Sequence, residues 1–417
     1  GFGGMGCCNH KAVVAEPMPT HSTTVSSPTG KPAKAVKLDA ERDFHREYRL
    51  EVKLGHGAFA VVYAVSRKDG SDNHLAVKVV DLRDAASKET GFDDTAMSLD
   101  VWRHRSVLNE TARLSTLSGH GNICHLRDRF IQGGLAYLVL AKYDRTLREA
   151  LDACEALNEE ALRPFFSGML KGLAEVHSRR IVHRDVKPDN FMCSGPDNIV
   201  KLCDFGLAAL TAPDSLDGCT GVNGSAPFMS PEMLQGLPYG VKTDTWSFGV
   251  IVYVLFFGRF PYATARNTPP AMKFAIASGS QLPSFCDKGE AGPGGVSDGA
   301  RSWARSLLCR DPQARPTCAE ALEQEFFTLG QPSRCSLRGH LYAAKQIGAC
   351  EDAARHQAPS ALDMHMIGLQ AKHHRSPTRM APGLASDYST DAGSTLGGSE
   401  QSTCFSARTQ GTARVAA

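Results

Sequence analysis

The sequence contains no run of 18 consecutive apolar residues, so we predict no transmembrane helix. The apolar stretch near Val250–Phe257 is too short to span a bilayer. The formal net charge is only +2, which argues against a nucleic-acid partner bound over the whole chain. The 13 cysteines include no CxxC pair and no Cys/His cluster with zinc spacing. We therefore expect a reduced, intracellular protein without a structural zinc.

Oxygen-bearing side chains gather in one stretch, Ile181–Gly206, with the sequence IVHRDVKPDNFMCSGPDNIVKLCDFG. The turn-rich SGPDN lies between two strand-like runs, which predicts a hairpin. A hairpin returns its ends to one place, so Asn190 and Asp204 should lie side by side. Asp185 precedes Asn190 on the loop that enters the hairpin. This set of ligands suits Mg²⁺ held together with substrate phosphates.

A glycine-containing stretch, Leu54–Val62, has the pattern Gly-x-Gly-x-x-Ala-x-Val. The pattern alone also fits a dinucleotide-binding turn, which should open a helix. Here two β-rich runs follow, so the glycines should lie at a hairpin tip where backbone N–H groups approach phosphates. Lys78 lies on the second of these runs and needs an anionic partner if buried. Glu110, on a helix with an apolar face, is the candidate partner.

Taken in order, these motifs resemble those of a eukaryotic protein kinase, together with Ser230-Pro231-Glu232, Asp244 and Arg315. The chain is similar to the serine/threonine type and weakly resembles the calcium/calmodulin-dependent group. The resemblance implies an α+β, bilobal fold with a kinase domain over 48–329. Its small β-rich N-lobe would span 48–142 and its larger helical C-lobe 143–329. Tails over 1–47 and 330–417 should be largely disordered.

The resemblance also implies transfer of the γ-phosphate of Mg-ATP to protein Ser/Thr hydroxyls, with roles for individual residues. Asp185 would accept the hydroxyl proton, Lys187 would reach the γ-phosphate, and Asn190 and Asp204 would hold Mg²⁺. Lys78, paired to Glu110, would hold the α- and β-phosphates. The expected ATP pocket comprises Leu54, Gly55, Gly57, Ala60, Val62, Ala76, Lys78, Leu140, Ala141, Tyr143 and Met192. A pseudokinase that only binds nucleotide is the rival hypothesis, but Lys78, Asp185 and Asp204 are all present.

Regulation is expected in the activation segment, Leu207–Glu232. A phosphate on Thr220 would pair with Arg184, and the Ser225 hydroxyl should contact Asp185. At the N-terminus, Met5 followed by Gly6, Cys7 and Cys8 fits myristoylation and palmitoylation if translation starts at Met5.

The kinase would then be cytoplasmic and tethered to a membrane; the alternative is an unmodified tail. A basic amphipathic helix over Arg334–Ala358 would bind calmodulin, act as a pseudosubstrate, or simply flank the domain. No EF-hand loop pattern occurs in the sequence.

Overall fold

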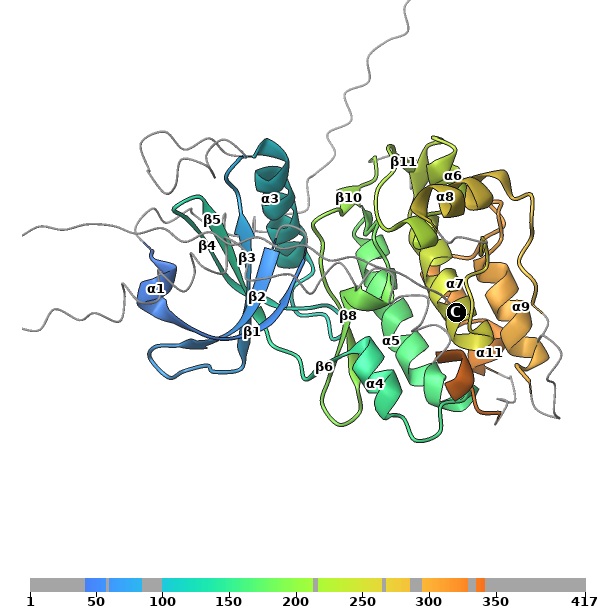
Figure 1. The fold of residues 1–417 in the computed structure, drawn as a ribbon, viewed down its shortest axis with the longest axis horizontal. Helices are drawn as coiled ribbons and strands as arrows, with labels where there is room; N and C mark the ends of the chain where they lie inside the picture. The colour runs from blue at the N-terminus through green and yellow to red at the C-terminus, as the bar shows by residue number, and fades with distance from the viewer. Residues whose placement is uncertain are drawn as a thin grey trace, which may run out of the picture. The chain divides into compact units, whose positions relative to one another are not determined.

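The computed structural model describes residues 42–57, 60–84, 100–212, 217–264, 268–285, 295–328 and 335–341. Figure 1 shows a small lobe built on one β-sheet, followed along the chain by a larger, mainly helical lobe. This arrangement confirms the predicted α+β, bilobal fold. Among the described residues, no helix is long and apolar enough to cross a membrane.

The small lobe is a five-stranded antiparallel sheet with the strand order β1-β2-β3-β5-β4. Alternating β-branched residues such as Val61, Val65, Val77 and Val79 form its buried face, which explains why these segments are strands. One long helix, α3, begins at the N-cap Asp100, whose side chain accepts a hydrogen bond from the backbone of Arg103. The elements are β1 (Tyr48–His56), β2 (Ala60–Arg67), β3 (Leu75–Asp81), α3 (Val101–Thr116), β4 (Leu126–Gln132) and β5 (Leu135–Ala141).

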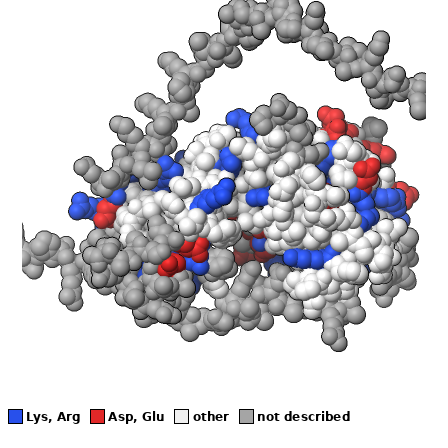
Figure 2. All heavy atoms as spheres, turned by 90° about the horizontal axis from the view of Figure 1, so that it is seen from above, with Lys and Arg blue, Asp and Glu red and all other residues white. Residues whose placement is uncertain are grey.

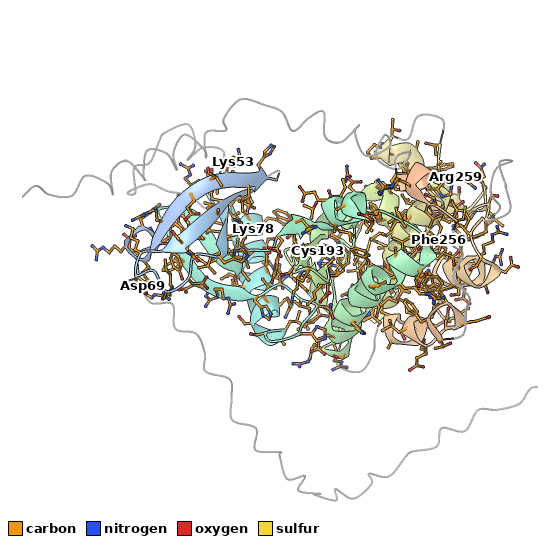
Figure 3. All side chains as sticks on the ribbon, turned by 90° about the horizontal axis from the view of Figure 1, so that it is seen from below. Lys53, Asp69, Lys78, Cys193, Phe256 and Arg259 are labelled. Carbon is orange, nitrogen blue, oxygen red and sulfur yellow. The ribbon has the colours of Figure 1, made fainter. Side chains whose placement is uncertain are left out.

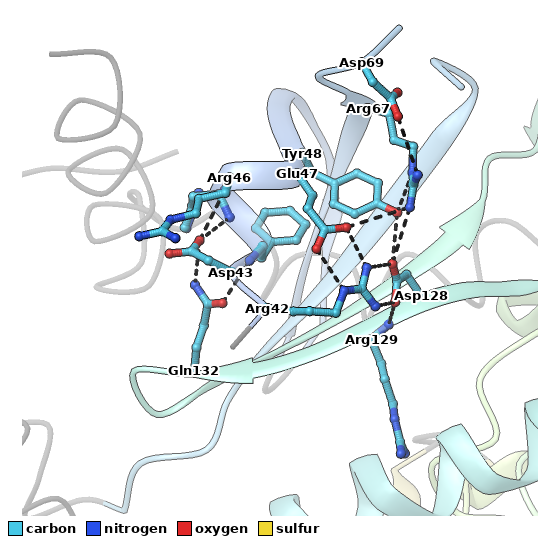
Figure 4. A network of polar contacts seen from close by, with 12 residues as sticks. Arg42, Asp43, Arg46, Glu47, Tyr48, Arg67, Asp69, Asp128, Arg129 and Gln132 are labelled. Carbon is cyan, nitrogen blue, oxygen red and sulfur yellow. Dashed lines mark hydrogen bonds and ion pairs between the residues drawn. The ribbon is translucent and has the colours of Figure 1, made fainter. Parts of the chain in front are cut away.

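A short helix, α1 (Phe44–Glu47), precedes the sheet and packs on it. Phe44 is fully buried and stacks on Tyr137, with 4.4 Å between ring centroids. Arg42 pairs with both Glu47 and Asp128, as Figure 4 shows. We predicted disorder up to residue 47, and for residues 43–47 that prediction is wrong. The reason is long-range burial, which composition does not reveal. Residues 1–41 lie outside the described part of the chain.

The larger lobe carries the rest of the described chain. Its helices are α4 (Leu147–Ala153), α5 (Glu159–Ser178), α6 (Pro231–Leu234), α7 (Lys242–Phe257), α8 (Pro269–Ser278), α9 (Asp298–Leu307), α10 (Cys318–Leu322) and α11 (Glu325–Thr328). Its short strands are β6 (Arg145–Thr146), β7 (Ile181–Val182), β8 (Phe191–Ser194), β9 (Ile199–Leu202), β10 (Ala209–Leu210), β11 (Asp217–Cys219) and β12 (Tyr239–Gly240). Two 3₁₀ turns lie at Pro188–Asn190 and Ala226–Phe228.

Helix α7 forms the centre of this lobe. Nearly all of its side chains are buried, which is typical of a helix that is apolar on every side. It ends at Gly258, whose φ of 65° is left-handed. A Cβ on Gly258 would lie 3.0 Å from the Cα of His340, so residues 335–341 pack directly against this helix end.

The described part of the C-terminal tail is docked on the larger lobe. Leu337 is buried, and its backbone N–H donates to Leu157 at 2.7 Å. Leu341 is also buried, and the Arg338 guanidinium donates to the backbone of Cys154 and Glu155. The folded part of the larger lobe therefore includes residues 335–341, past the predicted boundary at 329, while residues 342–417 lie outside the described chain.

Charge is dispersed over the surface. On the face shown in Figure 2, Lys and Arg form separate patches between uncharged residues and acidic groups. On this face, the basic side chains of the described residues therefore lie scattered and do not form one continuous stripe.

Candidate active site

The glycine stretch lies where β1 turns into β2. The backbone N–H of Gly57 donates to Ala60 at 2.7 Å, and His56 pairs with Val61, so the predicted hairpin tip is present. A Cβ on Gly55 would meet no atom within 4 Å, and one on Gly57 would come no closer than 3.9 Å. Contacts within the protein therefore do not demand glycine at either position. A ligand that approached this backbone closely would demand glycine at both positions.

Lys78 is the centre of a three-residue charge cluster. Its Nζ lies 3.0 and 2.9 Å from the two carboxylate oxygens of Glu110 and 2.9 Å from Oδ1 of Asp204. Figure 3 shows Lys78 on the sheet of the small lobe, at the side where the larger lobe begins. Glu110 comes from α3, and Asp204 follows β9. This cluster therefore joins both lobes, and it contains the partner of Lys78 that we expected.

The charges in this cluster stabilise one another. Burial opposes the charge on Lys78, but Asp204 and Glu110 outweigh it and raise its pKa. Lys78 in turn lowers the pKa of Asp204 to about 2. Burial raises the pKa of Glu110, and Lys78 opposes that shift. At neutral pH Asp204 is therefore a carboxylate, which is the form that binds a cation.

Asp185 already holds a hydroxyl group. Its Oδ1 accepts hydrogen bonds from both the backbone N–H and the Oγ of Ser225, each at 2.9 Å. Lys187 donates to the same Oγ at 2.9 Å and lies 2.9 Å from Oδ2 of Asp185. The expected contact between Ser225 and Asp185 is thus present. A carboxylate and an ammonium group converge on one serine hydroxyl.

Gly224 makes this approach possible, and the sequence alone did not single it out. Its φ is +95°, and a Cβ there would lie 2.3 Å from the backbone oxygen of Arg184. Only glycine allows the activation segment to come so close to the loop that carries Arg184 and Asp185. A glycine before a Ser-x-Pro turn was the available signal, but its contact with residue 184 depends on the fold.

The predicted hairpin in the central stretch is formed by β8 and β9, with Phe191 opposite Leu202. It returns the chain to its start, and the backbone N–H of Cys203 donates to the Asn190 carbonyl at 2.8 Å. The side chain of Asn190 donates to the backbone oxygen of Asp185 at 2.7 Å. Asn190 therefore lies beside Asp185, and its backbone is bonded to the residue that precedes Asp204.

A buried carboxylate, Asp244, fixes the catalytic loop from behind. It accepts hydrogen bonds from the backbone N–H groups of His183 and Arg184 at 2.8 and 2.9 Å. It also pairs with the imidazole of His177 at 2.9 Å. The ring of His183 lies edge-on to Phe205, which follows Asp204. These contacts hold the backbone next to Asp185 in place. His177 was not among the residues we had predicted.

The other residues expected in the ATP pocket come from both lobes. Ala76 is buried opposite Leu140 on the paired strands β3 and β5, and Val62 lies opposite Lys78. Partly buried Leu140 and Ala141 end β5, partly buried Met192 lies on β8, and Leu54 is exposed on β1. Ala60 opens β2. The Tyr143 hydroxyl accepts a hydrogen bond from the backbone of His125, so this side chain braces the inter-lobe connection.

A cavity of about 590 Å³ lies between α3 and the start of the activation segment. Its lining contains three guanidinium groups, those of Arg105, Arg113 and Arg184, and no carboxylate. Nε of Arg113 is buried without a hydrogen-bond partner among the described residues. Arg184 uses its own Nε to donate to the Leu207 carbonyl at 2.6 Å. Positive charge is thus concentrated beside the activation segment.

Helix α3 is bonded to the segment after Asp204. Ser106 donates to the Gly206 carbonyl at 3.0 Å, and Asn109 donates to the Ala208 carbonyl at 2.5 Å. Farther along the segment, Thr220 is exposed, and its carbonyl accepts from the Tyr239 hydroxyl at 3.2 Å. Ser106, Asn109 and Tyr239 were not predicted as site residues. Only the tertiary structure brings them to this segment.

The fold and this constellation of side chains define a protein kinase. The sequence model of the protein kinase domain family matches residues 48–327, more than half of the chain, and the chain belongs to that family. Among curated proteins, it is 30% identical over 286 residues to rat calcium/calmodulin-dependent protein kinase type 1B. That alignment covers 67% of this chain and 75% of the relative.

Two plant relatives are comparable. A calcium/calmodulin-dependent serine/threonine-protein kinase 1 from rice is 32% identical over 287 residues, covering 67% of this chain and 44% of the relative. CDPK-related kinase 5 from Arabidopsis thaliana is 31% identical over 288 residues, again covering 67% and 44%. The chain is therefore an ATP-dependent protein serine/threonine kinase that weakly resembles the calcium/calmodulin-dependent group.

Proposed function

We propose that this kinase acts in intracellular signalling and that it transfers phosphate with the residues predicted from its motifs. The observation that carries the assignment is the pair of contacts at Lys78 and Asp185. Lys78 bridges Glu110 and Asp204 across the lobes, and Asp185 already accepts a serine hydroxyl. Phosphate transfer is mostly a matter of positioning and charge stabilisation, and these contacts would position both reactants.

The side chains fit a magnesium ion. Asp204 supplies a carboxylate of depressed pKa. The Asn190 amide nitrogen donates to Asp185, and the amide oxygen would serve as the second ligand. Mg²⁺ prefers such hard oxygen donors and would neutralise the negative charge of the phosphates. Lys78 would hold the α- and β-phosphates while Glu110 keeps it in place. Lys187 would contact the γ-phosphate.

Asp185 would act on the acceptor hydroxyl. In the structure Oδ1 of Asp185 accepts a hydrogen bond from the Ser225 Oγ, and Lys187 donates to that Oγ. A substrate serine or threonine bound next to Ser225 would present its hydroxyl to the same carboxylate. Asp185 would orient this hydroxyl and accept its proton as the oxygen attacks the γ-phosphate.

The test is transfer of labelled phosphate from ATP to a generic basic protein. We expect Asp185→Asn to lower the rate by about 10²–10⁴-fold, the typical contribution of a positioned acid or base. Asp197→Asn, a change in the exposed turn of the β8–β9 hairpin, is the matched control and should leave the rate unchanged. Equal rates for wild type and Asp185→Asn would favour the pseudokinase alternative.

The metal assignment has its own measurement. A chelator should stop transfer and added Mg²⁺ should restore it. The expected order of damage is greatest for Asp185 and Asp204, next for Lys78 and mildest for Glu110. If Asp204→Asn retained wild-type activity at every Mg²⁺ concentration, Asp204 would not be a ligand.

We further propose that phosphorylation of Thr220 regulates the enzyme through Arg184. The exposed hydroxyl of Thr220 and the guanidinium-lined cavity beside the activation segment support this proposal. A phosphate adds a charge of about −1.5 to −2 and pairs well with arginine. Phosphatase treatment and Thr220→Ala should lower activity to the same degree, whereas the exposed Thr116→Ala on α3 should not. Full activity of Thr220→Ala would contradict the proposal.

We propose that acylation at Gly6, with Cys7 and Cys8 as palmitoylation sites, tethers the cytoplasmic kinase to a membrane. These residues lie outside the described part of the chain, and the support is their sequence alone. One myristoyl chain holds a membrane only at about 10⁴ M⁻¹, so the cysteines supply the second signal. Fractionation of cells expressing wild type and Gly6→Ala is the test. A Gly6→Ala protein that remains on membranes would refute acyl anchoring.

Calmodulin is a proposed partner of the segment that begins at Arg334. Names of two of the relatives include calmodulin, and the segment carries basic and apolar residues. Because Leu337 and Leu341 are buried on the larger lobe, calmodulin would have to release them before binding. Calcium-dependent capture of the kinase on immobilised calmodulin is expected, and it should weaken for Leu337→Asp. No capture with calcium would refute this partner.

A further inference from the structure

Cys203 directly precedes Asp204, and Cys124 lies on the neighbouring segment that pairs with the chain at Leu202. Ile123 and Leu202 form a parallel bridge, in which Cys124 donates to the Leu202 carbonyl and Leu202 donates to the Asn122 carbonyl, both at 2.9 Å. The next pair along this ladder is Cys124 and Cys203. Because the two segments pair in parallel here, we expect the two side chains on the same side, and the Cys203 thiol is the first influence on the pKa of Cys124.

This spacing suits a disulfide. Neighbouring strands lie about 4.8 Å apart, and bridged cysteines usually have Cα atoms about 4.4–6.8 Å apart. Cys203 is partly exposed and Cys124 is buried. An oxidant in solvent therefore reaches Cys203 first, and Cys124 is placed to react with it next. The neighbouring Cys203 thiol and burial raise the pKa of Cys124, which slows its reaction, so it is the position of Cys124 beside Cys203 that makes it the partner in the second step.

The backbone of Cys203 is built into the active site. Its N–H donates to Asn190 at 2.8 Å, and its carbonyl contacts the Nε2 of His183 at 3.0 Å. The next residue, Asp204, has a φ of 60° and holds Lys78 at 2.9 Å. An S–S bond is about 2.05 Å long, so the sulfur atoms of two free cysteines must move closer to form it. Movement of Cys203 displaces the atoms that position Asp204.

We propose that Cys124 and Cys203 form a reversible disulfide when the kinase meets a hydroperoxide, and that this bond lowers its phosphate-transfer activity. The sulfur of Cys203 attacks one peroxide oxygen, the O–O bond breaks, and with hydrogen peroxide one water leaves as a sulfenic acid forms. The sulfur of Cys124 then attacks Cys203, and the sulfenic oxygen leaves as a second water. In sum, two thiols and one H₂O₂ give one disulfide and two waters. A dithiol reductant reverses the bond.

The functional consequence rests on the proposed roles of Asp204 and Asn190, whereas the disulfide itself does not. A displacement of about 1 Å in a catalytic constellation costs up to about 10²-fold in rate. We expect oxidation to lower phosphate transfer by about tenfold or more. Dithiothreitol should restore it.

The experiment treats the full-length kinase with hydrogen peroxide and digests it without reduction. Mass spectrometry should find a peptide pair joined by Cys124 and Cys203 that disappears on reduction. Activity should fall and recover in parallel. Cys124→Ser and Cys203→Ser should each prevent the reversible loss. Cys154→Ser, which removes a partly buried thiol at the end of α4, is the control and should behave as wild type.

Three results would overturn the proposal: no linked peptide in oxidised wild type, a linked peptide with unchanged activity, or equal reversible loss in both serine variants. The mass measurement needs no catalysis. An inactive enzyme would therefore refute the proposed function, but the disulfide could still be detected or excluded. If a serine variant fails to fold, the time courses of linkage and activity in wild type still decide. They must coincide.

Discussion

A buried ion pair behind the catalytic loop makes this kinase's stability depend on pH. The imidazole of His177 lies 2.9 Å from Asp244, with side-chain exposures of 9% and 0%. Burial opposes a charge on the imidazole, but Cys318 and Asp244 outweigh it and raise the pKa of His177 from 6.5 to about 10. Asp244 also holds two backbone N–H groups of the catalytic loop. Loss of the proton therefore weakens the support of Asp185.

The sign follows from proton binding. Below pH 6.5 both folded and unfolded chains carry the proton on His177, so the pair contributes its full stability. Between pH 6.5 and about 10 only the folded chain keeps this proton. Stability then falls by about 1.4 kcal/mol per pH unit for one proton. Over the window this amounts to at most roughly 4–5 kcal/mol for one proton.

The assay is urea unfolding of wild type and His177→Gln at several pH values from 6 to about 9.5. Glutamine keeps a donor toward Asp244 but does not titrate, so its unfolding free energy should lack this slope. The difference between the two proteins should shrink by about 1.4 kcal/mol per pH unit above pH 6.5. Parallel pH profiles for the two proteins would refute a protonated His177 in the native state.

Further changes should act through other buried contacts. Phe44→Ala should lower the unfolding free energy by about 3–5 kcal/mol in urea titrations, because it empties a fully buried aromatic site before the family domain begins. Glu232→Gln should cost about 3–5 kcal/mol in the same assay, because it leaves the Arg315 guanidinium, 2.7 Å away and fully buried, without its counter-charge. Gly224→Ala should abolish phosphate transfer while ATP binding by calorimetry persists, because its Cβ would clash with the Arg184 carbonyl. Wild-type stability in either of the first two, or wild-type transfer in the third, would contradict these assignments.

Several features of the site followed from the sequence because they are local. The SGPDN turn between two apolar runs is sufficient to specify the β8–β9 hairpin and so to bring Asn190 near Asp204. The hairpin around Gly55 and Gly57 followed from flanking β-rich runs. The pairing of Lys78 with Glu110 required one further step, the expense of burying an unpaired charge. Each inference used only neighbouring residues or the chemistry of one side chain.

Other features were decided by tertiary packing. Phe44 and Leu337 look like tail residues, yet each is buried against a lobe. His177 reaches Asp244, 67 residues away, and its charge depends on that buried partner. The contact between Cys124 and Cys203 exists only because two distant segments pair in parallel.

Motif spacing by itself indicated that this chain is a kinase and predicted which groups would face the phosphates, because phosphate chemistry demands those groups in that order. Only the tertiary structure decided what holds them in place and that residues 43–47 and 335–341 pack on the lobes. The physical reason is that burial and pairing between residues far apart in the chain depend on the whole packed structure. Turns and the need to pair a charge, by contrast, depend on short stretches of sequence.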